Sequence, residues 1–125
     1  MKEVRFKGCK LIGVNFSSCS DFLFSVNFQK CLLDYCSFAD KKMKSTSFSD
    51  CSMKEVDFSA TDLTMSVFQN CDLQQAVFNR TNLEKADFRT ATNYTIDPES
   101  NKMKKAIFSH YGIAGLLRKY NIEIE

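Results

Sequence analysis

The sequence is poor in the two residues that usually make tight turns. Its 125 residues include one proline and four glycines, and it has no tryptophan and a single histidine, His110. A chain that turns often with so little glycine and proline must make its corners from ordinary residues. This shortage indicates one repeated backbone device rather than assorted turns.

Long apolar runs are also absent. No stretch approaches the roughly 20 apolar residues of a membrane span, and the opening residues, MKEVRFKGCKLIGVNF, have no apolar run of signal-peptide length. Six cysteines without a secretory signal are typical of a reducing compartment. We therefore expect a cytoplasmic protein with free thiols and no membrane segment.

Neither sign of charge is in large excess. The chain has 17 Lys and Arg residues against 15 Asp and Glu residues, a net charge of +2. A balance this close gives the chain as a whole no attraction to nucleic acid or acidic lipid. The length is that of one domain.

What the sequence does contain is a repeat with a period of five. Residues 26–90 divide without a gap into thirteen blocks of five, and residues 4–18 supply three more. The third residue of a block is Phe, Leu or Met, and the first is nearly always small. Residues 19–25 are seven where five would fit, which we interpret as one block with a two-residue insertion.

Aligning every fourth block sorts the central residues into four columns. Two columns contain only Phe and two contain only Leu or Met, whereas aligning every third block would mix these types. The columns are Phe28, Phe48, Phe68 and Phe88; Leu33, Met53 and Leu73; Phe38, Phe58 and Phe78; and Met43, Leu63 and Leu83. Phe6, Leu11 and Phe16 precede their partners by four blocks plus the two inserted residues. The pattern therefore predicts a coil with four sides.

Over residues 4–90 this pattern resembles the pentapeptide-repeat family. The resemblance implies an all-β fold, a right-handed quadrilateral parallel β-helix of about 4–5 coils. It places the third residue of each block inside the coil and the first residue beside it. Lys41 departs from the pattern at a normally small inward position, so we expect it to be pushed outward or to mark a distorted coil.

The ends of the repeat are expected to differ. The β-helix is assigned to residues 1–105, of which 91–105 look irregular, and a C-terminal cap to residues 106–125. Phe108 follows Phe88 at the column spacing, which predicts a return to the first Phe column. The opening residues predict no comparable cap, and homodimers are common in the family, so an end of the solenoid is a candidate for self-association.

The cap is predicted to be a short α-helix followed by a strand. The helix is expected over about residues 110–119, with Ser109 as its N-cap. Its apolar side would carry Ile113, Leu116 and Leu117. Alternation of Ile122 and Ile124 predicts a terminal strand over 121–125.

The residues that usually carry chemistry form no catalytic or metal-binding pattern. The first-position cysteines, which we interpret as small apolar fillers, are Cys9, Cys31, Cys36, Cys51 and Cys71. A linear ladder of thiols cannot surround a tetrahedral zinc ion, and His110 belongs to no nucleophile pattern. The second-position carboxylates Asp57, Asp62, Asp72 and Asp87 belong to different sides. We expect no catalytic residue, metal or cofactor.

Two functions from different classes remain. The first is a non-catalytic rigid scaffold that binds an unidentified protein partner. The alternative comes from the resemblance, because quinolone-resistance members of the family mimic DNA and bind DNA gyrase. Mimicry needs a dense negative surface, whereas residues 26–90 carry nine acids and eight bases.

Direct nucleic-acid binding ranks below both functions. It would use Lys41, Lys42, Lys44 and the lysines of residues 102–105. These clusters have acids between them and lack outward aromatic residues on which bases could stack.

Overall fold

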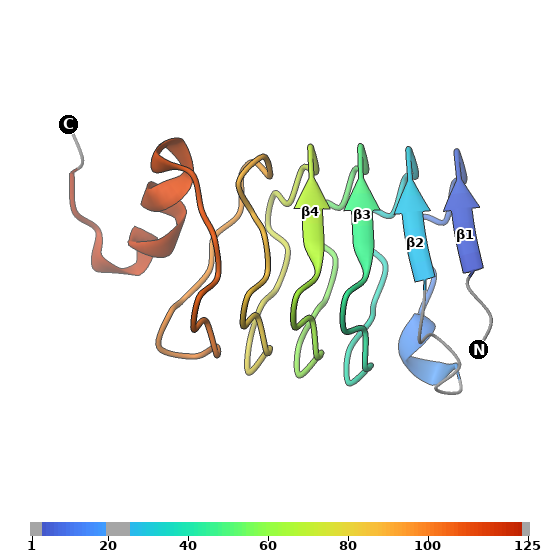
Figure 1. Ribbon diagram of the computed structural model, residues 1–125, viewed down its shortest axis with the longest axis horizontal. Coiled ribbons are helices and arrows are strands. Elements are labelled where there is room, and N and C mark those ends of the chain that lie inside the picture. The colour runs from blue at the N-terminus through green and yellow to red at the C-terminus, as the bar shows by residue number, and fades with distance from the viewer. Residues whose placement is uncertain (1–3, 20–25, 124–125) are drawn as a thin grey trace.

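The coils of the chain stack along one axis as a rod. The computed structural model describes residues 4–19 and 26–123. Strand β1 lies near one end of the rod and the C-terminal helical turns lie at the other (Figure 1). No helix within the described residues is long and apolar enough to cross a membrane.

One side of the rod is a four-stranded parallel sheet. Its strands are β1 (Val4–Lys7), β2 (Val26–Gln29), β3 (Ser47–Ser49) and β4 (Val67–Gln69), in that order. Phe6 pairs with Phe28 across the insertion, and Phe28 pairs with Phe48 four blocks later. Isolated parallel bridges such as Leu32–Ser52, Ser37–Asp57 and Lys42–Asp62 repeat the four-block spacing on the other three sides. The predicted four-sided parallel β-helix is confirmed.

We number the four faces of the rod by their blocks. Face 1 contains the sheet and residues 26–30, 46–50, 66–70, 86–90 and 106–110. Faces 2 and 3 begin with 31–35 and 36–40 and return with every fourth block. Face 4 contains 41–45, 61–65, 81–85 and 101–105. The two-residue insertion lies where the first coil would reach face 4, and residues 20–25 lie outside the described residues.

Left-handed residues at the fifth position of a block make the corners. Tyr35, Met65 and Lys85 have φ values of 64°, 59° and 59°. Further fifth-position examples are Lys30, Asp40, Ser45, Asp50, Glu55, Ala60, Asn70, Gln75, Arg80 and Lys105, with Gly8 and Gly13 in the first coil. None is β-branched, as expected for a conformation that crowds Cβ. This repeated corner explains how the chain turns with so few glycines.

The core consists of the predicted columns. Phe28 and Phe48 stack with ring centroids 5.3 Å apart and planes 3° apart, and Phe58 meets Phe68 edge to face at 83°. The two Phe columns therefore stack along the axis and interlock across it, a favourable aromatic geometry. Phe6 and Leu11 in the first coil are only partly buried, whereas Phe16 and the central residues from Phe28 to Phe88 are buried.

Residues 91–105 continue the coil, and residues 93–101 within them form no bridge. Thr92 pairs with Asp72, and Lys102 pairs with Asn82. Met103 packs against the core four blocks after Leu83. Asn93 and Pro98 stand where apolar centres are expected, and Tyr94 and Ile96 are buried instead.

The cap is helical but not α-helical, a second correction. It consists of two 3₁₀ segments, η2 (His110–Leu116) and η3 (Arg118–Tyr120). Gly115 lies so close to Tyr94 that a Cβ there would collide with its carbonyl oxygen. Two glycines, Gly112 and Gly115, in a segment this short weaken an α-helix, and 3₁₀ turns are common in such short pieces.

The cap buries only some of the apolar residues that were predicted to face the core. Phe108 stacks on Phe88, as predicted, with centroids 5.2 Å apart. Leu116 packs against the core and Leu117 is half-buried, but Ile113 is exposed. Ser109 makes no side-chain capping bond.

No terminal strand is present in the described part of residues 121–125. Asn121 takes a left-handed conformation that ends η3, and residues 122–123 carry no strand. The left-handed residue turns the chain out of the direction that a strand would need. Residues 124–125 lie outside the described residues.

Lys41 is buried, so the expectation that it is pushed outward was wrong. That it marks a distorted coil stays a prediction, because residues 20–25 lie outside the described residues. Its side chain is 7% exposed, and its Nζ donates to the Cys19 carbonyl. Its own carbonyl accepts from the Asp62 amide at 2.9 Å, as in the other coils. A buried ammonium needs such acceptors, and the first coil supplies at least one.

Candidate binding faces

Where the first residue of a block is Cys, Ser or Thr, its side chain can donate a hydrogen bond to the preceding coil. Thr81 Oγ1 donates to the Phe58 carbonyl at 2.7 Å, and Ser66 Oγ donates to the Met43 carbonyl at 2.9 Å. The thiols of Cys51 and Cys71 make longer contacts, 3.5 and 3.4 Å, with the carbonyls of Phe28 and Phe48. The sequence interpretation of these residues as fillers missed this donor role, although the prevalence of Cys, Ser and Thr signalled it.

All six cysteines are free thiols. Burial raises the pKa of Cys31 and of Cys36. A hydrogen bond with Cys51, together with burial, raises the pKa of Cys71. Thiols with raised pKa values are poor nucleophiles and poor ligands. Cys9 and Cys19 are half-buried.

The second-position carboxylates stabilise their own turns. Asp57 accepts from the Ser59 amide at 2.8 Å, and Asp72 accepts from the Gln74 amide at 3.1 Å. Asp62 bonds Thr64 in the same way, and Asp87 forms a 2.8 Å ion pair with Arg89. The structure does not bring these four carboxylates together. Within residues 4–19 and 26–123 no group of three or more His, Cys, Asp or Glu residues could hold a metal ion.

The remaining surface consists of flat faces on a fixed grid. On face 4, Met43 N donates to Asp62 O at 2.8 Å, and Leu63 N donates to Asn82 O at 2.8 Å. Leu83 N then donates to Lys102 O at 2.7 Å. These ladders hold each outward side chain beside its counterpart in the next coil. Any binding surface on the rod is therefore pre-organised.

The faces differ in charge. Over residues 26–105, face 1 is neutral, face 2 carries a net charge of −2 and face 3 a net charge of −3. Face 4 has two carboxylates, Asp62 and Glu84, against six exposed lysines. The lysines are Lys42, Lys44, Lys85, Lys102, Lys104 and Lys105. The residue count over blocks 26–90 missed this asymmetry because three of the lysines lie in the last coil.

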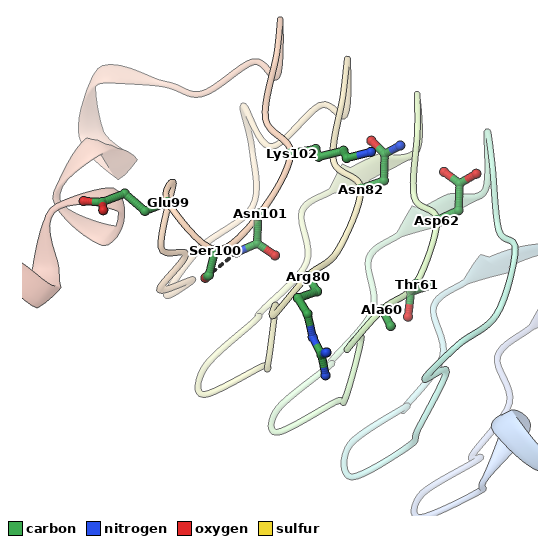
Figure 2. Close-up of a pocket in the computed structure, with 9 residues that line it drawn as sticks. All are labelled: Ala60, Thr61, Asp62, Arg80, Asn82, Glu99, Ser100, Asn101 and Lys102. Atoms are coloured by element: carbon green, nitrogen blue, oxygen red, sulfur yellow. Dashed lines mark hydrogen bonds between the residues drawn. The ribbon is translucent and has the colours of Figure 1, made fainter.

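A shallow groove crosses the C-terminal half of face 4 and its corner with face 3. Figure 2 shows Asp62, Asn82 and Lys102 side by side along it, with Arg80 at the corner. Its volume is about 420 Å³. Ser100 and Asn101 add hydroxyl and amide groups to its wall. The groove is polar and open, and it offers hydrogen bonds rather than an enclosed apolar pocket.

A separate polar cluster, which was not predicted from the sequence, joins the cap to the last coil. Lys119 Nζ lies 3.0 Å from a carboxylate oxygen of Asp97 and 3.0 Å from one of Glu99. Tyr120 Oη donates to Glu99 at 2.6 Å. His110 is exposed at the start of η2. This cluster fastens the cap to the last coil and leaves the lysines of face 4 outside it.

Comparison with solved structures finds other coiled repeat proteins. HetL, a pentapeptide-repeat protein from the cyanobacterium Nostoc sp. strain PCC 7120, matches with a TM-score of 0.58 and 14% identity. The match covers 84% of this chain and 46% of HetL, so the chain spans less than half of HetL's length. At this identity the likeness shows the fold alone.

Two further solved structures are less similar. Rfr23 from the cyanobacterium Cyanothece 51142 has a TM-score of 0.38 and 18% identity, over 86% of this chain and 89% of that one. QnrB1, a plasmid-mediated fluoroquinolone resistance protein, has a TM-score of 0.32 and 12% identity, over 94% and 100%. Among curated protein sequences none matches.

The family model described as a pentapeptide repeat region matches residues 21–88. This is more than half of the 125 residues, and it covers most of the blocks that build the coils. The chain therefore belongs to the pentapeptide-repeat family.

Proposed function

We propose that the protein is a non-catalytic scaffold that binds a protein partner through an outward face. Pentapeptide-repeat proteins are generally structural scaffolds. The observation that carries the proposal is the fixed grid of outward side chains. On face 4 the backbone hydrogen bonds that hold this grid, from one coil to the next, have N···O distances of 2.7–3.1 Å. A surface that is already ordered loses little conformational entropy when a partner binds.

The packing of the interior also supports a scaffold function. The first-position donors bond the carbonyls of the coil before them, and the Phe columns fill the space between. A core packed in this way leaves recognition to the exposed second, fourth and fifth positions of the blocks. Those positions carry the polar and charged side chains that protein interfaces use at their rims.

Affinity capture tests the proposal. The tagged protein is incubated with lysate from its source cells, with and without an excess of untagged protein. We expect at least one protein to be retained in a saturable way and lost in the presence of the competitor. Retention that the competitor does not reduce, or no retained protein, contradicts the scaffold function.

The charge distribution weighs against DNA mimicry. The most negative side, face 3, has a net charge of −3, and two of its acids, Asp97 and Glu99, are paired with Lys119. Duplex DNA carries one negative charge per about 1.7 Å of its axis. We expect micromolar protein neither to inhibit supercoiling by DNA gyrase nor to protect it from a quinolone.

We also propose a cytoplasmic location and treat self-association as a testable extension. The free cysteines support a reducing compartment. Fractionation of the source cells tests the location. Sedimentation over a range of concentrations tests whether two copies associate through an end of the rod.

A further inference from the structure

Face 4 concentrates positive charge that nothing within the described residues neutralises. Its six exposed lysines make no ion pair there, whereas Arg89 is paired with Asp87, and Lys119 with Asp97 and Glu99. The net charge of the exposed face is +4. Exposed lysines also occur singly on faces 1 and 2, such as Lys30 and Lys54, whereas face 4 gathers six of them.

The arrangement of the lysines is costly in the isolated protein. Lys85 and Lys105 occupy the same corner one coil apart, and Lys102 and Lys104 are second and fourth residues of one block. Like charges on adjacent strands are destabilising. A ligand of opposite charge that spans these coils would remove the repulsion and gain contacts at once.

The groove of face 4 gives such a ligand more than charge to recognise. Lys102 and Asn82 lie along it as neighbours, and Arg80 stands at its edge (Figure 2). Ser100 and Asn101 also line it. The Asn101 amide group donates to the carbonyls of Phe78 and Asp97, which holds this wall of the groove in place.

Arg80, Lys102 and the Asn82 amide suit a carboxylate, which accepts hydrogen bonds from guanidinium, ammonium and amide groups. Asp62 and Glu99 also line the groove, so a ligand meets charges of both signs there.

We propose that face 4 is the docking face of the scaffold and that it binds a carboxylate-rich segment of a partner protein. The inference rests on the proposed scaffold function and names the chemistry of its partner. Asp62 and Glu84 lie among the lysines, which favours a protein segment with some basic side chains over a uniform polyphosphate. Face 4 has no aromatic residue in its four blocks on which a nucleic-acid base could stack.

Two variants with equal net charge test the face. In the face-4 variant Lys102, Lys104 and Lys105 are changed to Gln. In the control variant Lys7, Lys30 and Lys54, which are exposed on faces 1 and 2, are changed to Gln. Thermal melting followed by circular dichroism checks that both remain folded. Because both lose three positive charges, any difference in binding reports the position of the charges.

The probe is a short fluorescein-labelled peptide rich in glutamate, followed by fluorescence anisotropy at physiological salt. Three surface ion pairs, each of modest strength, predict that the face-4 variant binds about tenfold more weakly than the wild type. The control variant should stay within about twofold of the wild type. A labelled duplex DNA of similar charge is run in parallel and should bind more weakly than the peptide.

Three results would overturn the inference. The first is that the peptide binds both variants equally more weakly than the wild type. The second is that the peptide does not bind the wild type measurably. The third is that duplex DNA binds the wild type more tightly than the peptide does and loses affinity in the face-4 variant. The captured protein separates this inference from the scaffold function. If it binds the wild type and both variants equally, face 4 is not the docking face but the scaffold function stands; if the wild type retains no protein, the scaffold function itself fails.

Discussion

Within a block of five, each residue position has its own physical role. The third residue fills the core. The first is small, and where it is Cys, Ser or Thr its side chain donates a hydrogen bond to the coil before it, as Thr81 does to Phe58. The second caps the turn, as Asp57 does for Ser59, and the fifth turns the corner, as Met65 does. The fourth faces solvent, so it is one of the positions where function can vary without altering the fold.

The core position gives the first prediction. Phe58 is fully buried and stacks between Phe38 and Phe78, with centroids 5.5 and 5.4 Å apart. Phe58→Ala should lower the free energy of unfolding by about 3–5 kcal/mol, because it leaves a cavity in the column. Urea unfolding followed by circular dichroism measures this change. Phe108→Ala at the end of the same core is the control and should cost clearly less; equal losses would contradict a column packed most tightly at its centre.

The corner position gives the second prediction. Met65 has φ 59° and a partly exposed side chain, so its backbone strain can be changed without disturbing the core. Met65→Gly should be neutral or stabilising by up to about 1 kcal/mol, because glycine removes the left-handed cost but loses more chain entropy. Met65→Val should destabilise by about 1–2 kcal/mol relative to Met65→Gly, since its Cβ is branched. Thermal melting of both variants decides the order, and a valine variant as stable as the glycine variant would show that the corner is not strained.

Among the larger elements, the cap is the one that tertiary contacts shape most strongly. Tyr94 packs on Phe88 and Phe108, under the two glycines of η2. The Ile96 amide donates to the Gly115 carbonyl at 3.0 Å, which ties the last coil to the cap. The 3₁₀ turns are therefore the form of helix that fits over the Tyr94 ring.

The Tyr94 hydroxyl gives a prediction for this contact. It is buried without a hydrogen-bond partner within the described residues. A buried unsatisfied hydroxyl costs about 1–3 kcal/mol, so Tyr94→Phe should be neutral or stabilising by about 1 kcal/mol. Gly115→Ala should instead loosen the cap, because its Cβ would meet the Tyr94 carbonyl oxygen. Hydrogen exchange at the Ile96 amide reports cap docking, and faster exchange in Tyr94→Phe than in the wild type would contradict this prediction.

The ion pairs of the cap predict a pH dependence. A hydrogen bond from the Glu99 amide, with Lys119 close by, lowers the pKa of Asp97. The Tyr120 hydroxyl and Lys119 lower the pKa of Glu99. Groups with lowered pKa values stabilise the folded cap above their unfolded pKa values of about 4, and this stabilisation is lost as the pH falls through the folded values.

Hydrogen exchange at the Ile96 amide should therefore accelerate, relative to core amides, as the pH falls from neutral to about 3. Exchange rates are corrected for the intrinsic effect of pH. In Lys119→Met the carboxylates lose their cation, so this relative acceleration should be smaller. A variant that keeps the full acceleration would mean that the ion pairs do not hold the cap.

At the scale of the whole molecule, the repeat could be predicted because its physics is local and periodic. The Phe and Leu/Met columns return with every fourth block, and this spacing reports the coil directly. The left-handed conformation of the fifth residue could not be predicted in the same way, since residues such as Tyr35 and Glu55 that adopt it share no residue type. The sequence assigned residues 91–105 to the β-helix but not the residues that fill its core, because Asn93 and Pro98 interrupt the apolar pattern while Tyr94 and Ile96 are buried.

The candidate site depended on that last coil. Lys102, Lys104 and Lys105 join Lys42 and Lys44 on one face only when residues 101–105 are known to continue the coil. Without them face 4 looks evenly charged. The stacking of the coils decides which charged residues become neighbours, so the excess of lysine on face 4 is visible only in the three-dimensional structure.

Lysine footprinting tests the central claim, that one face of a rigid rod docks a protein. The protein, alone and with the partner recovered by affinity capture, is labelled with an amine-reactive reagent, and the label at each lysine is measured by mass spectrometry. We expect Lys42, Lys44, Lys85, Lys102, Lys104 and Lys105 to be protected by the partner. Lys7, Lys10, Lys30 and Lys54, exposed on faces 1 and 2, should react as before. Protection spread evenly over all faces, or confined to lysines outside face 4, would contradict the account.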